Sequence, residues 1–279
     1  MSEKQNWQFT LSEYIRQGEP SRIEKSVAWQ TAIGLQAVDG LKTSQYLLDT
    51  AKEHIEDKID IDTAQERIQS YYEERRGRNK IAEDTKEADI VSSHIAAVLG
   101  ERAFQLSPVE WLEIHRRLFE GVFPHAGQIR TYNITKNEWV LNGDTVLYAS
   151  CNSIQAAMTY DFEMEKKFSY ENLAIREVIK HLSKFTSDIW QIHPFCEGNT
   201  RATAVFVIKY LKTLGFDIGN DAFSEHSWFF RNALVRANYN NICGGVVATT
   251  KYLDMFFENL LLGAKHELKN RILHVDYKV

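Results

Sequence analysis

The sequence is poor in proline, glycine and cysteine. Its 279 residues include 4 prolines, 14 glycines and 3 cysteines. The cysteines Cys151, Cys196 and Cys243 lie far apart and form no C-x-x-C pair, which argues against a zinc site or a disulfide framework. Such sparse cysteine usage is typical of a protein in a reducing cytosol.

A basic surplus and a long apolar run are also missing. The formal net charge is -5 and the sequence pI is about 6.0, which argues against a general nucleic-acid binder. The first ten residues are polar and contain no signal core. No run approaches the ~20 apolar residues that span a bilayer. We therefore predict a cytoplasmic protein without a membrane partner and without direct nucleic-acid binding.

The apolar residues that are present favour helices. They recur with the spacing of one helix face at Ile175, Val178, Ile179 and Leu182, and again at Val207, Leu211 and Leu214. Around Asn142-Gly143-Asp144, two short apolar runs, 139–141 and 145–148, resemble the arms of a β-hairpin, because Asn-Gly suits a type I′ turn. The pattern predicts a mainly α fold with one β-hairpin.

A densely charged segment near residues 72–89 suggests an internal boundary. Two or three shorter helices are expected before it, at 21–38, 43–55 and 62–72. One long helical region is expected after it. The charged segment itself is interpreted as a linker or a solvated helix.

The run from His193 to Arg201 combines the groups that phosphate transfer requires. His193 can accept a proton near neutral pH, and Glu197 offers a carboxylate that suits Mg²⁺. Gly198 can adopt backbone angles that other residues avoid, and the helix expected at about 201–214 would present free N–H groups to an anion. Arg201 adds a forked cation for phosphate oxygens. Together these features predict a phosphate-transfer site at a helix start.

This run, His193-Pro194-Phe195-Cys196-Glu197-Gly198-Asn199-Thr200-Arg201, resembles the signature of the Fic family, His-x-Phe-x-(Asp/Glu)-Gly-Asn-x-Arg. The resemblance extends to the segments 111–119, 124–130 and 257–263. It implies a Fic-type helical bundle over 92–271, preceded by a helical segment at 1–72 and a charged linker or helix at 73–91, and followed by a tail at 272–279. It also implies that the hairpin is a flap holding a target segment, with the flap residues Gly143, Thr145, Val146 and Leu147.

The family implies transfer of AMP from ATP, with Mg²⁺, to a hydroxyl of a protein. His193 would deprotonate the hydroxyl, Glu197 would ligate Mg²⁺, and Arg201 would neutralise the leaving pyrophosphate. Phe195 would pack beneath the loop. The other implied ligand contacts are phosphate contacts by Gly198, Asn199 and Thr200, and base contacts by Tyr239 and Asn240.

One position departs from the family pattern. Many members that use ATP carry a second arginine three residues after the first, and this chain has Ala204 there. Several alternatives to AMP transfer from ATP therefore stay open. The protein could use another nucleotide, transfer phosphate as Doc-like enzymes do, remove AMP from a protein, or serve as a catalytically weak regulatory module. The protein substrate, self-modification and a homo-oligomer are open as well.

The N-terminal segment resembles the small antitoxins of Fic toxin–antitoxin pairs. Their inhibitory pattern, Ser/Thr-x-x-x-Glu-Gly/Asn, has its nearest counterpart at residues 35–40, with Asp39 and Gly40 as the candidate inhibitory pair. The alternative is that Gly40 simply ends a helix. Because Ala204 removes the arginine that such a carboxylate pairs with, we expect any inhibition to be steric rather than ionic.

Overall fold

The computed structural model describes residues 19–75, 80–219 and 222–277, and within them the secondary structure is helical. The only β-pairing recorded there is an isolated bridge between Asn241 and Val246. The α-helices are α2 Arg22–Leu35, α3 Gln45–Ile55, α4 Ile61–Glu74, α5 Lys80–Gly100, α6 Pro108–Phe119, α7 Ile154–Lys167, α8 Ile175–Ile192, α9 Asn199–Thr213, α10 Ala222–Ala237 and α11 Lys251–Leu262, with short 3₁₀ turns η1 Gln36–Asp39, η2 Trp139–Leu141 and η3 Asn270–Leu273. The predicted mainly α fold is confirmed.

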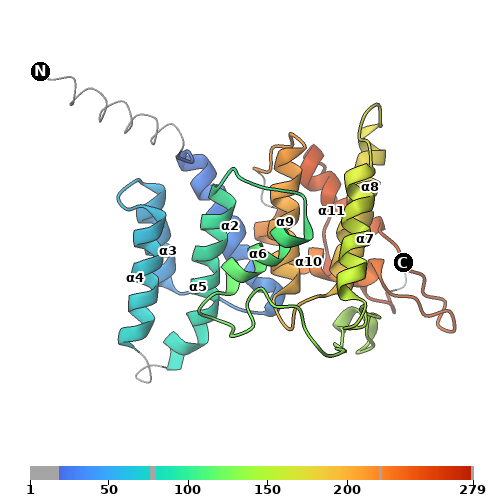
Figure 1. Ribbon diagram of the computed structural model, residues 1–279, viewed down its shortest axis with the longest axis horizontal. Coiled ribbons are helices and arrows are strands. Elements are labelled where there is room, and N and C mark those ends of the chain that lie inside the picture. The colour runs from blue at the N-terminus through green and yellow to red at the C-terminus, as the bar shows by residue number, and fades with distance from the viewer. Residues whose placement is uncertain (1–18, 76–79, 220–221, 278–279) are drawn as a thin grey trace, which may run out of the picture.

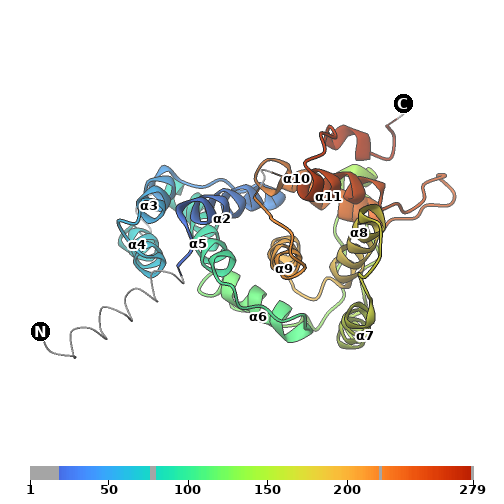
Figure 2. The same ribbon diagram turned by 90° about the horizontal axis from the view of Figure 1, so that it is seen from above.

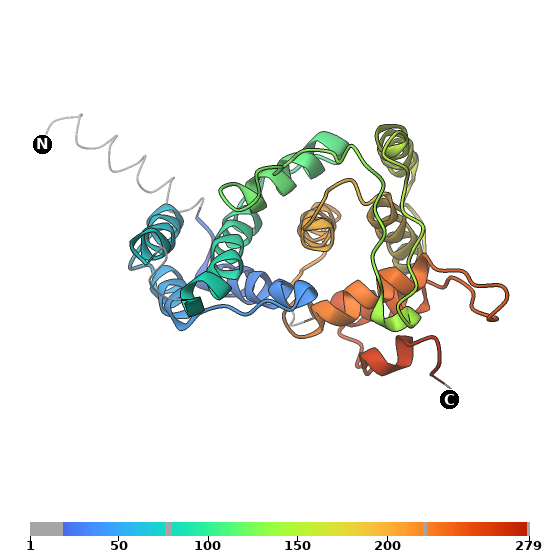
Figure 3. The same cartoon turned by 90° about the horizontal axis from the view of Figure 1, so that it is seen from below.

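Helix α9 forms the centre of the bundle. It appears end-on in Figure 2, with α5 and α6 on one side and α8, α10 and α11 on the other. Figure 3 shows the same arrangement from the opposite side. Every residue of α9 from Asn199 to Leu211 is buried. The loop that leads into α9 is therefore held by the core of the molecule.

The N-terminal helices belong to the same packed body (Figure 1). Helix α2 begins at a capping box in which Ser21 Oγ accepts from the backbone N–H of Glu24. Its buried face places Trp29 and Leu35 in the main core, and α2 packs against α5 and α10. Removal of α2 would therefore expose core surface.

A buried carboxylate joins the first helices to α5. Asp89 accepts hydrogen bonds from the backbone N–H of Ser44, at 2.8 Å, and from the Tyr72 hydroxyl, at 2.6 Å. Burial raises the pKa of Asp89. Since α5 runs from Lys80 to Gly100, it passes through the expected boundary at residues 91–92. The division of the chain into an N-terminal segment, a linker and a main domain stays a prediction.

The expected β-hairpin around Gly143 does not form as paired strands. Asn142 and Gly143 do adopt the positive φ angles of the predicted turn, 58° and 85°. The flanking residues form η2 and a short turn network, in which the N–H of Glu138 donates to Asp144 O at 2.9 Å and the N–H of Gly143 donates to Glu138 O at 3.0 Å. Among the described residues no ladder extends beyond it: the N–H of Lys136 bonds the Thr145 hydroxyl rather than a carbonyl, and Leu147 O accepts from Gln191 Nε2 of α8. The segment 136–147, which we call the flap loop, is thus a loop anchored to neighbouring helices.

Within the described ranges, none of the helices combines the length and the apolar character needed to cross a membrane.

Candidate active site

His193 ends α8 in a left-handed conformation, with φ 49° and ψ 58°, and its side chain is buried. Its Nδ1 lies 3.2 Å from the carbonyl oxygen of Trp190. Because a carbonyl can only accept, Nδ1 must carry the proton, which leaves a lone pair on Nε2. This is the tautomer of a histidine that takes a proton from a substrate.

The surroundings of His193 keep it neutral. Its ring lies against Tyr148, with centroids 4.2 Å apart, and edge-on to Trp190. Burial lowers the pKa of His193 well below its usual 6.5, and the nearby charges of Lys136, Arg231 and Arg130 lower it further. The imidazole is therefore unprotonated at physiological pH.

The loop after His193 is held from below by aromatic packing. Phe195 is fully buried and stacks on His115, with ring centroids 3.6 Å apart. His115 Nδ1 accepts from the N–H of Gly127, so its Nε2–H donates to the carbonyl of Glu197, at 3.0 Å. His115, which lies in the segment 111–119 that resembles the Fic pattern, thus supports the loop from α6.

Asn199 closes the loop on itself. Its Oδ1 accepts from the N–H of Phe195 at 3.0 Å, and its Nδ2 donates to the carbonyl of Phe195 at 2.8 Å. The side chain that was expected to contact phosphate is therefore engaged with backbone in this structure. Similarly, the Thr200 hydroxyl accepts from Trp190 Nε1.

Gly198 is required at the turn into α9 for two reasons. Its φ is 75°, which side chains rarely adopt, and a Cβ there would lie 2.3 Å from the ring of Phe119. The turn leaves the first N–H groups of α9 without intrahelical partners. Those groups, with the helix dipole behind them, are the ones that an anion would contact, and anion binding here stays a prediction.

Arg130 is a residue whose role the sequence did not predict. It is 2% exposed, and its guanidinium donates to the carbonyls of Tyr132, Ala149, Ile192 and His193. Two of these carbonyls belong to the C-terminal end of α8, where a positive charge also offsets the helix dipole. Arg130 thereby fixes the backbone that carries His193. It lies in the segment 124–130 that resembles the Fic pattern, which was the available signal.

Arg201 is not free in this structure. Its side chain is 2% exposed, its Nη2 lies 2.7 Å from Glu87 Oε1, and its Nη1 donates to Gln36 Oε1 at 3.0 Å. Its Nε lies 2.8 Å from Asp39 Oδ2, although the N–H does not point along this contact, so the pair is ionic without a hydrogen bond. Two carboxylates and one amide, from η1 and α5, therefore surround the guanidinium that was predicted to bind phosphate.

These contacts overturn one expectation. Asp39 was expected to lack an arginine partner, because Ala204 replaces the second motif arginine, and inhibition was expected to be steric. Asp39 instead pairs with the first motif arginine, Arg201. Gly40 also ends η1 in a left-handed conformation with φ 71°, as the alternative interpretation expected, and the inhibitory role of the Asp39-Gly40 pair stays a prediction.

Glu197 is the exposed member of the loop. Its side chain is 57% exposed and its Oε2 lies 3.2 Å from Lys136 Nζ of the flap loop. Within the described residues no group of three or more His, Cys, Asp or Glu side chains could hold a metal. A lone, accessible carboxylate fits Mg²⁺ that takes its other ligands from nucleotide phosphates and water.

The other predicted site residues lie around the flap loop. Val146 is buried, whereas Leu147, the last residue of the flap loop, is 83% exposed. The Tyr239 hydroxyl donates to Asp144 at 2.6 Å, and Asn240 Oδ1 accepts from the N–H of Ala248. The structure brings Tyr239 to the flap loop, and base recognition by Tyr239 and Asn240 stays a prediction.

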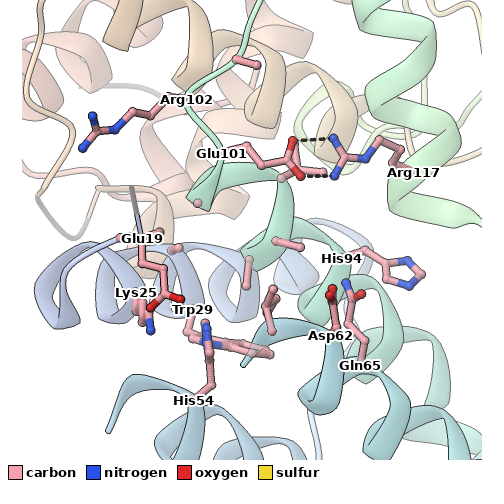
Figure 4. A pocket seen from close by; sticks show the side chains of 18 of the residues that line it. Glu19, Lys25, Trp29, His54, Asp62, Gln65, His94, Glu101, Arg102 and Arg117 are labelled. Atoms are coloured by element: carbon pink, nitrogen blue, oxygen red, sulfur yellow. Dashed lines mark hydrogen bonds and ion pairs between the residues drawn. The ribbon is translucent and has the colours of Figure 1, made fainter. Parts of the chain in front are cut away.

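A separate cavity of about 750 Å³ lies among α2, α4, α5 and α6 (Figure 4). Trp29 and His54 are among its lining residues, and Trp29 Nε1 donates to His54 Nδ1 at 2.9 Å. Glu101 and Arg117 form an ion pair at its opposite wall, as Figure 4 shows. None of the residues from His193 to Arg201 lines this cavity, so it is distinct from the loop.

Residues 105–211 match the family model described as "Fic/DOC family". The chain therefore contains a Fic/DOC domain, and that domain includes Arg130, His193 and Arg201. The matched range is shorter than the 92–271 expected from the sequence.

Relatives with curated names match parts of the chain. The "Protein adenylyltransferase VbhT" of Bartonella schoenbuchensis is 23% identical over 165 residues, covering 59% of this chain and 33% of the relative. The "Probable protein adenylyltransferase y4lH" of Sinorhizobium fredii is 27% identical over 124 residues, covering 44% of this chain and 61% of the relative. The chain thus spans about a third and about three fifths of these two proteins.

Among solved structures, the N-terminal FIC domain of the Bep8 protein from Bartonella sp. 1-1C aligns with 67% of this chain and 88% of its own length. The TM-score is 0.47 and the sequence identity is 18%.

Proposed function

We propose that this protein is a Fic-type nucleotidyltransferase that moves AMP from ATP, with Mg²⁺, onto a hydroxyl of a protein, its own chain included. The observation that carries the proposal is the Nε2 lone pair of His193, set by the hydrogen bond from Nδ1 to Trp190, beside the start of α9. The names of two relatives as protein adenylyltransferases support the same reaction.

In this proposal His193 Nε2 takes the proton of the target hydroxyl as its oxygen attacks the α-phosphorus. The N–H groups at the start of α9 and the guanidinium of Arg201 bind the phosphates and offset the charge on the departing pyrophosphate. Glu197 would hold Mg²⁺, which when bound supplies positive charge to the phosphate oxygens. Phe195, Asn199 and His115 keep the loop in shape.

We further propose that the N-terminal region restrains the enzyme. Asp39 and Glu87 neutralise Arg201 and occupy the side that would face phosphate. A nucleotide must displace these carboxylates before Arg201 can bind it. The restraint is ionic, and it requires Asp39 to be present rather than only the bulk of the N-terminal helices.

A second candidate is a Doc-like phosphotransferase, which would transfer the γ-phosphate. Ala204, buried in α9, leaves no second motif arginine to hold the γ-phosphate in the usual way. Removal of AMP and a catalytically weak module stay open for the same reason.

The test is incubation of the full chain with cell lysate and ATP labelled at either the α- or the γ-phosphate. We expect protein-bound label from the α-phosphate and none from the γ-phosphate, with both signals absent in His193→Ala. Label from γ alone would establish the phosphotransferase, and no label from either position would contradict both candidates.

A further inference from the structure

Lys136 reaches the candidate metal ligand from the flap loop. Its Nζ lies 3.2 Å from Glu197 Oε2, and the side chains are 29% and 57% exposed. Ion pairs as exposed as this one contribute little to stability, because water screens them. The contact can therefore be exchanged for another at small cost.

The backbone beneath Lys136 is fixed more firmly than its side chain. Glu138, two residues on, is 1% exposed and pairs through both oxygens with Arg231 of α10, at 2.6 and 3.1 Å. The N–H of Lys136 bonds the Thr145 hydroxyl at 3.3 Å. The ammonium group can thus move by rotation of the four-carbon side chain while the backbone of the flap loop stays in place.

Four cations of the described residues, Arg130, Lys136, Arg201 and Arg231, lie around the His193 loop, and three of them are held by several contacts each. Arg231 pairs with both oxygens of the buried Glu138. Arg130 donates to the carbonyls of His193 and its neighbours, and Arg201 is surrounded by Asp39, Glu87 and Gln36. The recorded contact of Lys136 Nζ is the exposed carboxylate of Glu197. Of the four, Lys136 is the cation that a phosphate ligand can recruit most readily.

We propose that Lys136 is the second phosphate-binding cation of this site and fulfils the role for which α9 offers only Ala204. In the nucleotide-free protein it neutralises Glu197. When a nucleoside triphosphate binds, the ammonium exchanges the carboxylate for a phosphate oxygen, and Glu197 is released to hold the cation that accompanies the nucleotide. This inference rests on the proposed function of the loop.

The test compares two ligands that differ in their phosphates. Binding of adenosine and of α,β-methylene-ATP with Mg²⁺ is measured by calorimetry for the full-length wild type, Lys136→Met and Lys136→Arg. Lys166→Met serves as the matched control, because Lys166 is also a lysine paired with an exposed carboxylate, that of Glu163, but lies on α7.

Lys136→Met is expected to weaken α,β-methylene-ATP about tenfold, the order of one charge-assisted hydrogen bond, and to leave adenosine within about twofold. Lys136→Arg is expected to retain most of the affinity for the triphosphate analogue, and Lys166→Met all of it. Equal weakening of both ligands would show that Lys136 only supports the flap loop, and unchanged affinity for the analogue would also overturn the inference. If the wild type binds neither ligand, the proposed function itself is wrong and the role of Lys136 is refuted with it.

Discussion

The two ends of the loop from His193 to Arg201 are in different states. At the first end, His193 is neutral, buried and held in the tautomer of a base, and Arg130 fixes the backbone around it. At the other end, Arg201 is surrounded by Asp39, Glu87 and Gln36. One end is prepared for proton transfer, whereas the cation of the other end is occupied by groups of the same chain.

The difference indicates at which end the site can be controlled with the smaller structural change. Repositioning His193 would require Arg130, Trp190 and the core around Phe195 to move together, since interiors are close-packed. Releasing Arg201 requires only that partly exposed carboxylates be exchanged for phosphate oxygens, because the Asp39 and Glu87 side chains are 35% and 32% exposed. Under the proposed function, chemistry would take place at one end of the loop and regulation at the other.

The largest effect is expected from removal of the base. His193→Ala should lower nucleotidyl transfer by about 10²- to 10⁴-fold, as loss of a general base usually does. The rate is measured with ATP labelled at the α-phosphate, and folding is checked by circular dichroism. His266→Ala, a change of a partly exposed histidine paired with Glu258, is the control and should transfer at the wild-type rate. Equal rates for the two variants would remove His193 from the chemistry.

A smaller effect is expected when the support of the base is removed. Arg130→Met leaves four carbonyls without their donor, two of them, those of Ile192 and His193, buried, and we expect a loss of about 3 kcal/mol in the free energy of unfolding, with slower transfer. Denaturant unfolding measures this loss of stability. The control is Arg176→Met, at an exposed position of α8, which should change the free energy of unfolding by less than about 0.5 kcal/mol. Wild-type stability in Arg130→Met would mean that these hydrogen bonds do not hold the loop.

The pH dependence should show the lowered pKa of His193. Because burial keeps the pKa well below 6.5, the base stays neutral and the transfer rate should change by less than about twofold between pH 8 and pH 6. An ordinary histidine would lose more than half of its neutral form over that range. A rate that falls with a midpoint near pH 6.5 would show that the base is not buried in the active protein.

The same shift makes a prediction about stability. The unfolded chain takes up a proton at His193 near pH 6.5, and the folded chain does not. The free energy of unfolding should therefore fall as the pH drops below about 6.5, by up to about 1.4 kcal/mol per pH unit for this group. The lowered pKa values of the buried His54 and His94 act in the same direction. Urea unfolding of wild type and His193→Ala from pH 7 to pH 5 measures the difference in slope, and parallel slopes would contradict it.

The sequence predicted those features that depend on local pattern. The helices followed from apolar periodicity, and α9 begins within two residues of the expected start because Gly198 must turn the chain there. The positive φ angles at Asn142 and Gly143 also followed from the Asn-Gly pair. The flanking strands did not form, because backbone pairing ends at Glu138 and Asp144 and the groups beyond them bond side chains, those of Thr145 and of Gln191 in α8.

The features that escaped prediction depend on tertiary contacts. Arg201 meets Gln36 across 165 positions and Glu87 across 114, and no spacing rule reports such pairs. In the sequence, Arg130 cannot be told from a surface arginine. Its role becomes visible only in the folded chain, where its side chain donates to the carbonyl of His193 at the end of α8. A motif predicts which groups a site contains, whereas the fold decides which of them are already occupied.

The most direct test of the account is the rate of nucleotidyl transfer in Asp39→Ala, measured as α-phosphate label on protein, with the full chain. The account predicts an increase of about tenfold, a usual size for coupling between two sites, because Arg201 loses one of the carboxylates that hold it. Asp57→Ala removes an exposed carboxylate of the same N-terminal region, paired with Arg22 and Lys25, and should leave the rate unchanged. If Asp39→Ala folds normally and transfers no faster than the wild type and Asp57→Ala, the ionic restraint of Arg201 does not exist.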